Sequence, residues 1–234
     1  MGARQTSSNF AGTRYPFRCR LPVFLRTLAA MLRIENLGKR YDDHRVFEGL
    51  TYTFEPGCFA LCEEHQTGKS TLLSVIAGVT SPDEGEVWID RHSLRHAPER
   101  AKARMAYVPE NCLLEPMQTG RERLEAVARE KNVPLSDDVL GLAVELGLEP
   151  HLEKRFEQMS TGTRRKVFLV AADLGEPAVV VADGPTDGLD ARARAAVVEL
   201  FTEWARSRVV LFASHDADFV QACRAKQVNV AQLR

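Results

Sequence analysis

Two short segments of the sequence carry the residue types of a phosphate-binding ATPase site. The first is the run Gly68, Lys69, Ser70 and Thr71, which ends the pattern G-x-x-x-x-G-K-[ST]. In a loop of this kind the backbone N–H groups hold phosphate oxygens, the lysine reaches the outer phosphates, and the hydroxyl binds Mg²⁺. The second segment is VVVADGPTDGLD, which begins as an apolar run. Together the two segments predict ATP and Mg²⁺ as ligands.

The phosphate loop departs from its pattern at the start. Its candidate nucleotide-binding residues are Glu63, Glu64, His65, Gln66, Thr67, Gly68, Lys69, Ser70 and Thr71. Glu63 replaces the first glycine of the pattern, and a second carboxylate follows it at Glu64. A carboxylate roughly 7 Å from a phosphate charge repels it by about 2 kcal/mol at an effective dielectric constant of about 20. We therefore expect weakened nucleotide binding.

The residues around the loop predict the elements that position it. The apolar run Cys58 to Cys62 reads as a strand that ends at the loop, and Ser70 to Ala77 has apolar residues at helical spacing. Gly78 follows as a helix cap. Further upstream, Leu32 to Leu37 and Thr51 to Phe54 read as an antiparallel pair of strands. The predicted helix directs its free N–H groups and positive dipole end toward bound phosphates.

The order of the motifs resembles that of the nucleotide-binding subunit of ATP-binding-cassette (ABC) transporters, over residues 31–234. Besides the phosphate loop, the resemblance is carried by Tyr41, EGEV at 84–87, MAYVPE ending at Glu110, QMSTGTRRKV around Ser160, VVVADGPTDGLD around Asp183, and LFASHD around His215. The resemblance implies an α/β fold of the P-loop NTPase class. An ABC-type cassette has a mainly parallel sheet, an antiparallel β portion and a helical lobe, expected here at about 111–158.

The resemblance also implies a role for each candidate residue. Tyr41 would stack on adenine, although a tyrosine beside a strand often only packs there. Ser70 and Asp183 would hold Mg²⁺, Asp183 through water, whereas an aspartate at a strand end is otherwise a turn former. Glu110 stands where the family has a glutamine that touches Mg²⁺ and the attacking water. His215 would contact the terminal phosphate, although a lone histidine is usually structural.

A second copy of the cassette is implied by the signature segment. In the family, Ser160, Thr161, Gly162 and Thr163 would face the terminal phosphate bound by the other subunit, and Asp190 lies in the dimer loop. The serine also has a structural reason to be present, because its hydroxyl can cap the helix that follows. The two interpretations are compatible, and the partner could be identical or a different, intact cassette.

The main departure from the family pattern is Gly184. The family has a glutamate here that polarises the attacking water, and glycine has no side chain for that task. Loss of a general base costs about 10² to 10⁴ in rate. We expect slow hydrolysis at the chain's own site, with Glu110 as a residue that could partly substitute.

Residues 111–158 contain two helix-like stretches, Gly120 to Glu130 and Asp137 to Leu148. In the family this lobe meets a transmembrane permease subunit, which implies such a partner. The apolar faces of the two stretches could equally be ordinary core of the lobe.

Composition sets broad limits. The chain has 234 residues, 44% of them apolar and 27% charged, which is enough for one good-sized core. A net charge of -1 gives no sign of nucleic-acid binding. Apolar stretches fall far short of the ~20 residues that cross a bilayer, so we expect a cytoplasmic protein, peripheral on a membrane through its partner. Five cysteines without C-x-x-C spacing favour reduced thiols.

Residues 1–30 differ from the remainder. They contain no acidic residue and five arginines. Such a segment resembles an organelle transit peptide, but it could also be a disordered extension, or Met31 could be the true start. The predicted domains are therefore an extension, 1–30, and an ABC-type ATP-binding domain, 31–234.

Two functions compete. The first is the ATP-binding subunit of an ABC transporter, which couples nucleotide binding and dimerisation to a separate membrane-spanning partner. The alternative is a pseudo-ATPase, a nucleotide-responsive regulatory or binding module without turnover, favoured by Glu63, Glu64 and Gly184. A soluble cassette ATPase of DNA repair or translation is a third class, disfavoured because the chain has neither a long coiled coil nor a second cassette. The transported substrate and its direction are left open.

Overall fold

The computed structural model describes residues 31–62 and 68–233. The strands are β1 (Leu32–Tyr41), β2 (His44–Phe54), β3 (Gly57–Leu61), β4 (Glu84–Ile89), β5 (His92–Ser93), β6 (Met105–Val108), β7 (Val179–Asp183), β8 (Val209–Ala213) and β9 (Lys226–Val228). The helices are α1 (Lys69–Ile76), α2 (Pro98–Ala103), α3 (Gly120–Glu130), α4 (Asp137–Glu145), α5 (Thr161–Ala171), α6 (Ala191–Trp204) and α7 (Ala217–Ala222), with short 3-10 turns η1 (Glu149–His151), η2 (Phe156–Gln158) and η3 (Val230–Gln232). The expected extension, 1–30, and the loop residues Glu63, Glu64, His65, Gln66 and Thr67 lie outside the described residues.

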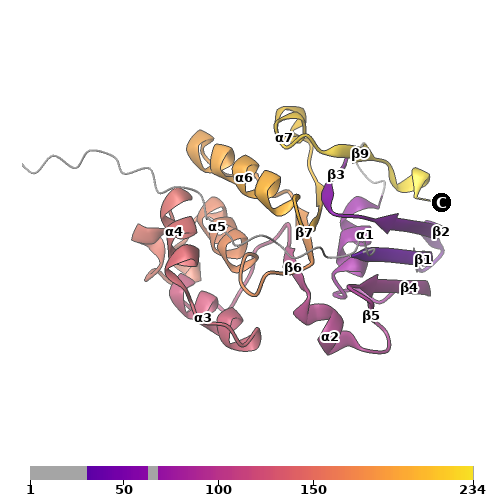
Figure 1. Ribbon diagram of the computed structural model, residues 1–234, viewed down its shortest axis with the longest axis horizontal. Helices are drawn as coiled ribbons and strands as arrows, with labels where there is room; N and C mark the ends of the chain where they lie inside the picture. Colours follow the sequence, from indigo (N-terminus) through magenta and orange to yellow (C-terminus); the bar gives the residue numbers. More distant parts are fainter. Residues whose placement is uncertain (1–30, 63–67, 234) are drawn as a thin grey trace, which may run out of the picture.

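The strands form two sheets of different type. One has the order β2-β1-β4-β5 and is antiparallel, and the other has the order β6-β7-β8-β3-β9 and is parallel. In Figure 1 the antiparallel sheet lies at one end of the molecule and helices α3, α4 and α5 lie at the other. This arrangement confirms the expected α/β class with a mainly parallel sheet, an antiparallel portion and helices.

The parallel sheet is buried on both faces, and β7 shows how. Val179 and Val181 face a core that includes α1 and the antiparallel sheet, while Val180 and Ala182 face a core that includes α5 and α6. Successive side chains of a strand point to opposite faces, so a strand between two layers needs apolar residues throughout. The continuous apolar run before Asp183 is therefore the signature of a central strand.

The helix ends follow local chemistry. Helix α1 ends at Gly78, whose φ is +66°, with the N–H groups of Gly78 and Val79 bonded back to Val75 and Ser74. Helix α4 ends in the same way, with Gly147 at φ +65°, and its last residue, Glu145, lies three residues before the predicted end at Leu148. Only glycine adopts this left-handed conformation without strain, so each glycine ends its helix by a Schellman arrangement.

The helical faces of residues 111–158 are core. The apolar residues of α3 and α4 singled out from the sequence are all buried in one cluster with α5: Leu124, Val127, Val139, Leu142, Ala143 and Leu146. Thr119 caps α3 through a reciprocal pair of hydrogen bonds with Glu122. The core interpretation of these faces is confirmed, and the domain boundaries themselves stay a prediction.

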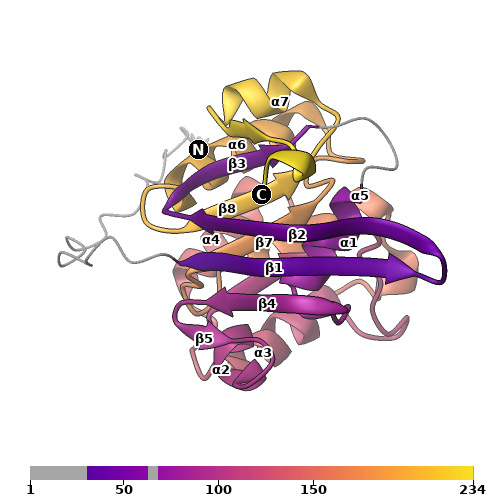
Figure 2. The ribbon, with the colours of Figure 1, turned by 90° about the vertical axis from the view of Figure 1, so that its right-hand side faces the viewer.

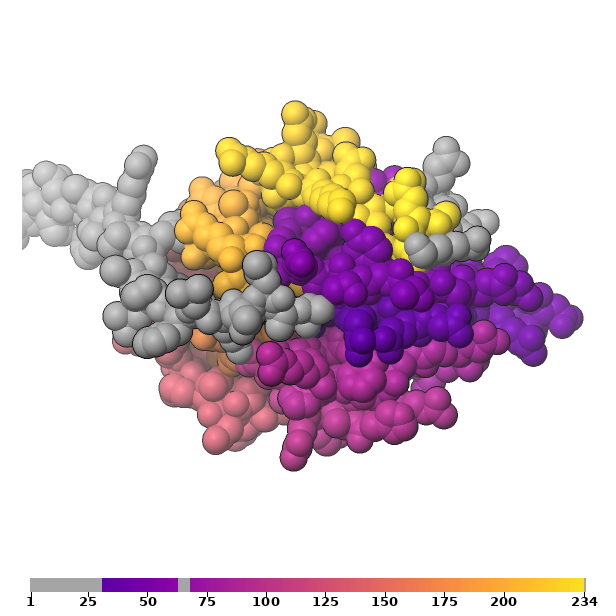
Figure 3. Space-filling view, turned by 45° about the vertical axis from the view of Figure 1, so that its right-hand side comes forward, coloured from indigo at the N-terminus to yellow at the C-terminus, as the bar shows by residue number. Residues whose placement is uncertain are grey.

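The predicted antiparallel pair is longer than its apolar residues suggested. β1 and β2 pair from Leu32 opposite Phe54 out to Tyr41 opposite His44, with Asp42 at φ +48° in the turn. Charged residues in the outer half of the hairpin interrupt the apolar pattern, so the full length of these strands was not predicted. The turn η3 lies against β2, where the N–H of Thr51 donates to the carbonyl of Leu233 at 2.6 Å. Figures 2 and 3 show this C-terminal segment, in yellow, beside the antiparallel sheet.

Candidate functional site

The described end of the phosphate loop is shaped by Gly68. This residue has a φ of +83° and immediately precedes α1. A Cβ atom at this position would lie 2.5 Å from Cγ1 of Val46, on β2, so a side chain here would collide with that of Val46. Lys69 and Ser70 are then the first two residues of α1, where unbonded N–H groups are available to an anion. Lys69 is buried and Ser70 is exposed.

The carboxyl ends of four parallel strands bring the predicted residues to one edge of the sheet. In the order β6, β7, β8 and β3, these ends are followed or completed by Glu110, Asp183, His215 and the phosphate loop. Adjacent parallel strands end at the same edge, which is where ligands bind in open α/β sheets. The topology therefore assembles residues that are up to about 150 positions apart in the chain.

Asp183 is the buried centre of this edge. Burial raises the pKa of its carboxyl group, a hydrogen bond from Ser70 lowers it, the charges of Glu110 and Asp187 raise it, and Arg165 lowers it. The hydroxyl of Ser70 and the carboxylate of Asp183 are thus in contact. A cation placed beside them would offset the mutual repulsion of the three carboxylates.

Oxygen donors of this kind suit Mg²⁺, which binds one or two carboxylates together with nucleotide phosphates and water. Ser70, Asp183 and Glu110 are the candidate ligands. Within residues 31–62 and 68–233 no group of three or more His, Cys, Asp or Glu side chains is arranged to hold a metal alone. A magnesium ion here would take most of its ligands from the nucleotide and from water.

Glu110 and His215 are exposed at the same edge. Glu110 lies two residues beyond β6, and its main-chain carbonyl accepts a hydrogen bond of 2.5 Å from Nη2 of Arg165. His215 lies two residues beyond β8. The next residue, Asp216, caps α7 and pairs with Arg194 at 2.6 Å. Both residues are exposed, and the backbone of Glu110 is held by Arg165.

Gly184 has a φ of +55°, and the space beside it is occupied. A Cβ atom at this position would overlap Oδ2 of Asp187 and lie 3.0 Å from its Cγ. The carboxylate of Asp187 therefore lies where a side chain at position 184 would begin. The sequence analysis did not single out Asp187. The available signal was its position three residues after Gly184, which stands where an acidic residue was expected.

Arg165 is a second residue that the sequence interpretation missed. Its side chain is 1% exposed, and Nη1 donates to the carbonyl of Asp187 at 2.8 Å while Nη2 donates to that of Glu110. Its Nε has no hydrogen-bond partner in the described part of the chain. Because arginine is usually exposed, its place in a charged TRRK run gave no sign of burial.

The signature residues form the start of α5. Ser160 is the N-cap, and its Oγ accepts from the N–H of Thr163 at 3.2 Å, which confirms its capping role. Thr161 is exposed, and Gly162 is buried against the loop after β7. A Cβ atom on Gly162 would overlap the carbonyl oxygen of Gly188. The start of α5 and this loop are thus in direct backbone contact.

Asp190 and Tyr41 are the remaining predicted site residues. Asp190 caps α6 through the N–H of Ala193 at 2.8 Å and pairs with Lys166 at 3.2 Å, and these bonds lower its pKa. Tyr41 ends β1 with 49% of its surface exposed, and Nζ of Lys39 lies 5.2 Å from the centre of its ring. Their roles toward a nucleotide stay predictions.

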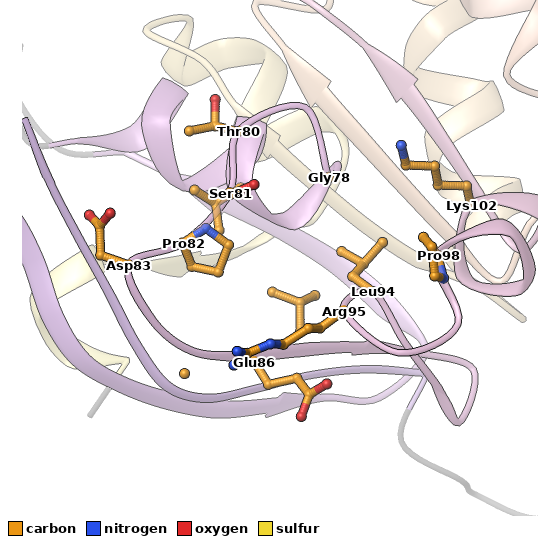
Figure 4. Close-up of a pocket in the computed structure, with 13 residues that line it drawn as sticks. Gly78, Thr80, Ser81, Pro82, Asp83, Glu86, Leu94, Arg95, Pro98 and Lys102 are labelled. Carbon is orange, nitrogen blue, oxygen red and sulfur yellow. The ribbon is translucent and has the colours of Figure 1, made fainter.

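A pocket of about 420 Å³ lies at the opposite end of α1, among Val75, Gly78, Leu94, Arg95 and Lys102 (Figure 4). None of the predicted site residues lines it. Its mouth carries both charge signs, since Asp83 and Glu86 also line it. The pocket is separate from the edge of the parallel sheet described above.

No helix within the described ranges is both long and apolar enough to cross a membrane. The four cysteines there, Cys58, Cys62, Cys112 and Cys223, are free thiols. Burial raises the pKa of Cys112 to about 11, so this thiol is not reactive at neutral pH.

Comparison with known proteins gives a consistent result. The family model described as ABC transporter matches residues 50–187. Nod factor export ATP-binding protein I of Burkholderia pseudomallei is 32% identical over 194 residues, which are 80% of this chain and 63% of that protein. The phospholipid-transporting ATPase ABCA7 of Homo sapiens is 32% identical over 204 residues, which are 84% of this chain and 10% of that protein. The chain thus spans less than two thirds of the length of these relatives.

Solved structures agree with the fold. An ATP-binding subunit of an ABC transporter has a TM-score of 0.76 and 28% identity, and the match covers 86% of each chain. The dimeric post-hydrolysis state of the ATP-binding cassette MJ0796 bound to ADP and Pi has a TM-score of 0.74. At 20% identity, with 87% of this chain and 99% of that one covered, the second match shows the fold alone.

Proposed function

The chain belongs to the ABC transporter family, and from this premise we propose that it is an ATP-binding subunit of a transporter. In this role nucleotide binding and dimerisation drive a separate membrane-spanning partner. The observation that carries the proposal is the contact between Ser70, at the start of α1, and Asp183, at the end of β7. It joins the two halves of the phosphate site that the sequence had placed more than a hundred residues apart.

ATP binds with its phosphates at the start of α1. Lys69 neutralises the outer phosphates, and Ser70 and Asp183 hold Mg²⁺, which offsets the negative charge of the phosphates when bound. Tyr41 stacks on adenine, a role supported by the position of Val46, on the same hairpin, next to Gly68. His215 contacts the terminal phosphate. Glu63 and Glu64 lower the affinity, and their arrangement lies outside the described residues.

Dimerisation completes the site. Ser160, Thr161, Gly162 and Thr163 bind the terminal phosphate held by a second cassette, and Asp190 contacts that subunit. The exposure of Ser160 and Thr161 at the start of α5 supports this, because both residues are accessible to a second subunit. The second cassette is either another copy of this chain or a different one with an intact phosphate site.

The membrane-spanning partner docks on the segment between Glu110 and α3. Leu113 and Met117 are 68% and 58% exposed there, unusual values for large apolar side chains. Docking through this segment places the protein on the cytoplasmic side of a membrane without a span of its own.

Calorimetry on the full chain with excess Mg²⁺ tests the proposal. We expect heat of ATP binding, and at least a tenfold loss of affinity in Lys69→Ala, because one charge next to phosphate is worth about 2 kcal/mol. Lys154→Ala removes a charge from an exposed position in the helical lobe and serves as the control. Absence of ATP binding by the folded wild type, alone and with its membrane partner, would falsify the proposal.

Gly184 favours a second candidate, a nucleotide-responsive module without turnover. Both candidates bind ATP, so binding alone does not separate them. Single-turnover hydrolysis does, because the module leaves bound ATP intact over hours and the transport subunit converts it slowly to ADP and phosphate.

A further inference from the structure

We propose that Asp187 is the catalytic carboxylate of this site, in place of the side chain that Gly184 lacks. It holds and deprotonates the water that attacks the terminal phosphate of ATP. The inference rests on the proposed ATP-binding function and concerns the same site. It also explains the glycine at position 184, because a residue without a side chain leaves space for the Asp187 carboxylate.

The first observation is steric. A Cβ atom on Gly184 would overlap Oδ2 of Asp187, so the carboxylate occupies the volume next to the Cα of residue 184. The φ of +55° at Gly184 lies in the region that residues with side chains rarely adopt. The backbone conformation and the position of the Asp187 carboxylate therefore both favour glycine here.

The second observation concerns the charged groups near the Asp187 carboxylate. Asp187 and Glu110 both act electrostatically on Asp183, which contacts Ser70 at the start of α1. The Asp187 carboxylate thus lies near Asp183, at the same edge of the sheet. Within the described residues no hydrogen bond or ion pair engages it, and the residue is exposed, so both oxygens are available to water.

The third observation is that the backbone around Asp187 is fixed. Its N–H donates to the carbonyl of Gly184 at 3.2 Å, and its own carbonyl accepts from Arg165 at 2.8 Å. The N–H of Gly184 donates to Ala213, on β8, at 3.0 Å. A fixed backbone limits the reorganisation that the carboxylate needs during the reaction, which favours catalysis.

The chemical step is a hydrolysis in which Asp187 accepts one proton. The water oxygen forms a bond to the terminal phosphorus, and the bond from that phosphorus to the bridging oxygen breaks. The bridging oxygen keeps the electron pair and leaves as ADP. One proton of the water passes to a carboxylate oxygen of Asp187 and then to solvent, and the other stays on the phosphate, so ATP and water give ADP, phosphate and a proton.

Glu110 is the other acid that could serve, and the structure distinguishes the two. Arg165 holds the main-chain carbonyl of both residues, but Glu110 follows β6, one strand away from the loop after β7. Asp187 instead belongs to the same loop as Gly184 and lies against it. The carboxylate that replaces the missing side chain is therefore that of Asp187.

The test is single-turnover hydrolysis of radiolabelled ATP by excess full-length protein with Mg²⁺. We expect Asp187→Asn, which keeps the shape and removes the charge, to slow hydrolysis by about 10² or more, the usual effect of losing a general base. ATP affinity should change by less than about threefold. Asp137→Asn, at an exposed position in the first turn of α4, removes the same charge and should leave the rate unchanged.

A pair of variants separates catalysis from loop structure. Gly184→Glu alone should not raise the rate, because its side chain collides with Asp187. Gly184→Glu combined with Asp187→Ser moves the carboxylate to position 184 and should recover hydrolysis lost in Asp187→Ser alone. Circular dichroism and thermal melts confirm that each variant is folded.

The outcomes distinguish this inference from the proposed function. Hydrolysis in Asp187→Asn at the wild-type rate overturns the role of Asp187 and leaves ATP binding intact. Binding by the wild type without any hydrolysis, even with its partner, overturns it as well and favours the module without turnover. A folded wild type that binds no ATP removes the proposed function and the inference together.

Discussion

Arg165 donates a hydrogen bond of 2.8 Å from Nη1 to the main-chain carbonyl of Asp187. Its Nη2 bonds in the same way to the carbonyl of Glu110 at 2.5 Å. One buried guanidinium on α5 therefore links the loops that follow β6 and β7. The planar fork of arginine suits two acceptors, whereas the ammonium of lysine is a compact point charge.

Arg165→Lys should therefore destabilise the protein and loosen both loops. Loss of one hydrogen bond from a charged donor to a buried acceptor costs about 1.5–3 kcal/mol. We expect the free energy of unfolding in urea to fall by this amount, with no change in its dependence on denaturant. Arg129→Lys, at an exposed position of α3, should shift it by less than about 0.5 kcal/mol, the usual range for surface substitutions. Equal stabilities of the two variants would contradict the linking role of Arg165.

Two glycine-to-alanine changes should have opposite effects. In Gly162→Ala the new methyl group overlaps the carbonyl oxygen of Gly188, so we expect a loss of stability of about 1–3 kcal/mol, as for overpacking in a core. Gly141, inside α4, has no heavy atom within 4 Å of an added Cβ. Gly141→Ala should stabilise the protein by about 0.5–1 kcal/mol through helix propensity. Thermal unfolding of both variants measures the contrast, and a neutral Gly162→Ala would show that α5 can move away at no cost.

Removing the two loop carboxylates should tighten ATP binding. In Glu63→Gln and Glu64→Gln the repulsion of about 2 kcal/mol per charge is lost before screening, which corresponds to at most about 30-fold in affinity for each. The gain should shrink as salt is raised from about 0.01 to about 1 M, because the Debye length falls from about 30 to about 3 Å. Titration calorimetry at two salt concentrations measures it, with Glu99→Gln at the start of α2 as the control. A salt-independent gain would point to loop shape rather than charge.

Asp183 should make the stability of the nucleotide-free protein depend on pH. Its pKa is raised above the ordinary value of 3.8, first by burial, so the folded state binds this proton more tightly than the unfolded chain does. The free energy of unfolding therefore falls as the pH rises from about 3.8 through the raised pKa. Asp183→Asn should melt at a higher temperature than the wild type at pH 7, with the difference vanishing below about pH 3.8. A lower melting temperature for the variant at pH 7 would mean that the carboxylate is stabilised instead.

The fold could be predicted well where local pattern and core burial agree. The run Val179 to Asp183 is apolar throughout because β7 is covered on both faces, and this reads directly as a central strand. Helix α3 matches its predicted bounds because Thr119 and Glu122 form a capping box and the apolar face is continuous. The outer half of β1 was not predicted, because its pairing with β2 continues through polar residues.

The residues of the site that belong to sequence motifs could be predicted, whereas the contacts between residues of the site could not. Lys69, Ser70 and Asp183 come from motifs whose spacing carries chemistry. Arg165 and Asp187 act through tertiary contacts, one by burial beneath two loops and the other by lying over a glycine. Neither contact produces a periodicity or a residue spacing that can be recognised in a single sequence.

The contact between Gly162 and Gly188 leaves no space for a side chain between α5 and the loop after β7. Any tilt of α5 when a second cassette engages Ser160 must displace Gly188, and Asp187 is its neighbour in the chain. Engagement of Ser160 by a second cassette would thereby reach the loop that carries Asp187. The contact between these two glycines would thus transmit the binding of a second cassette from α5 to the loop after β7.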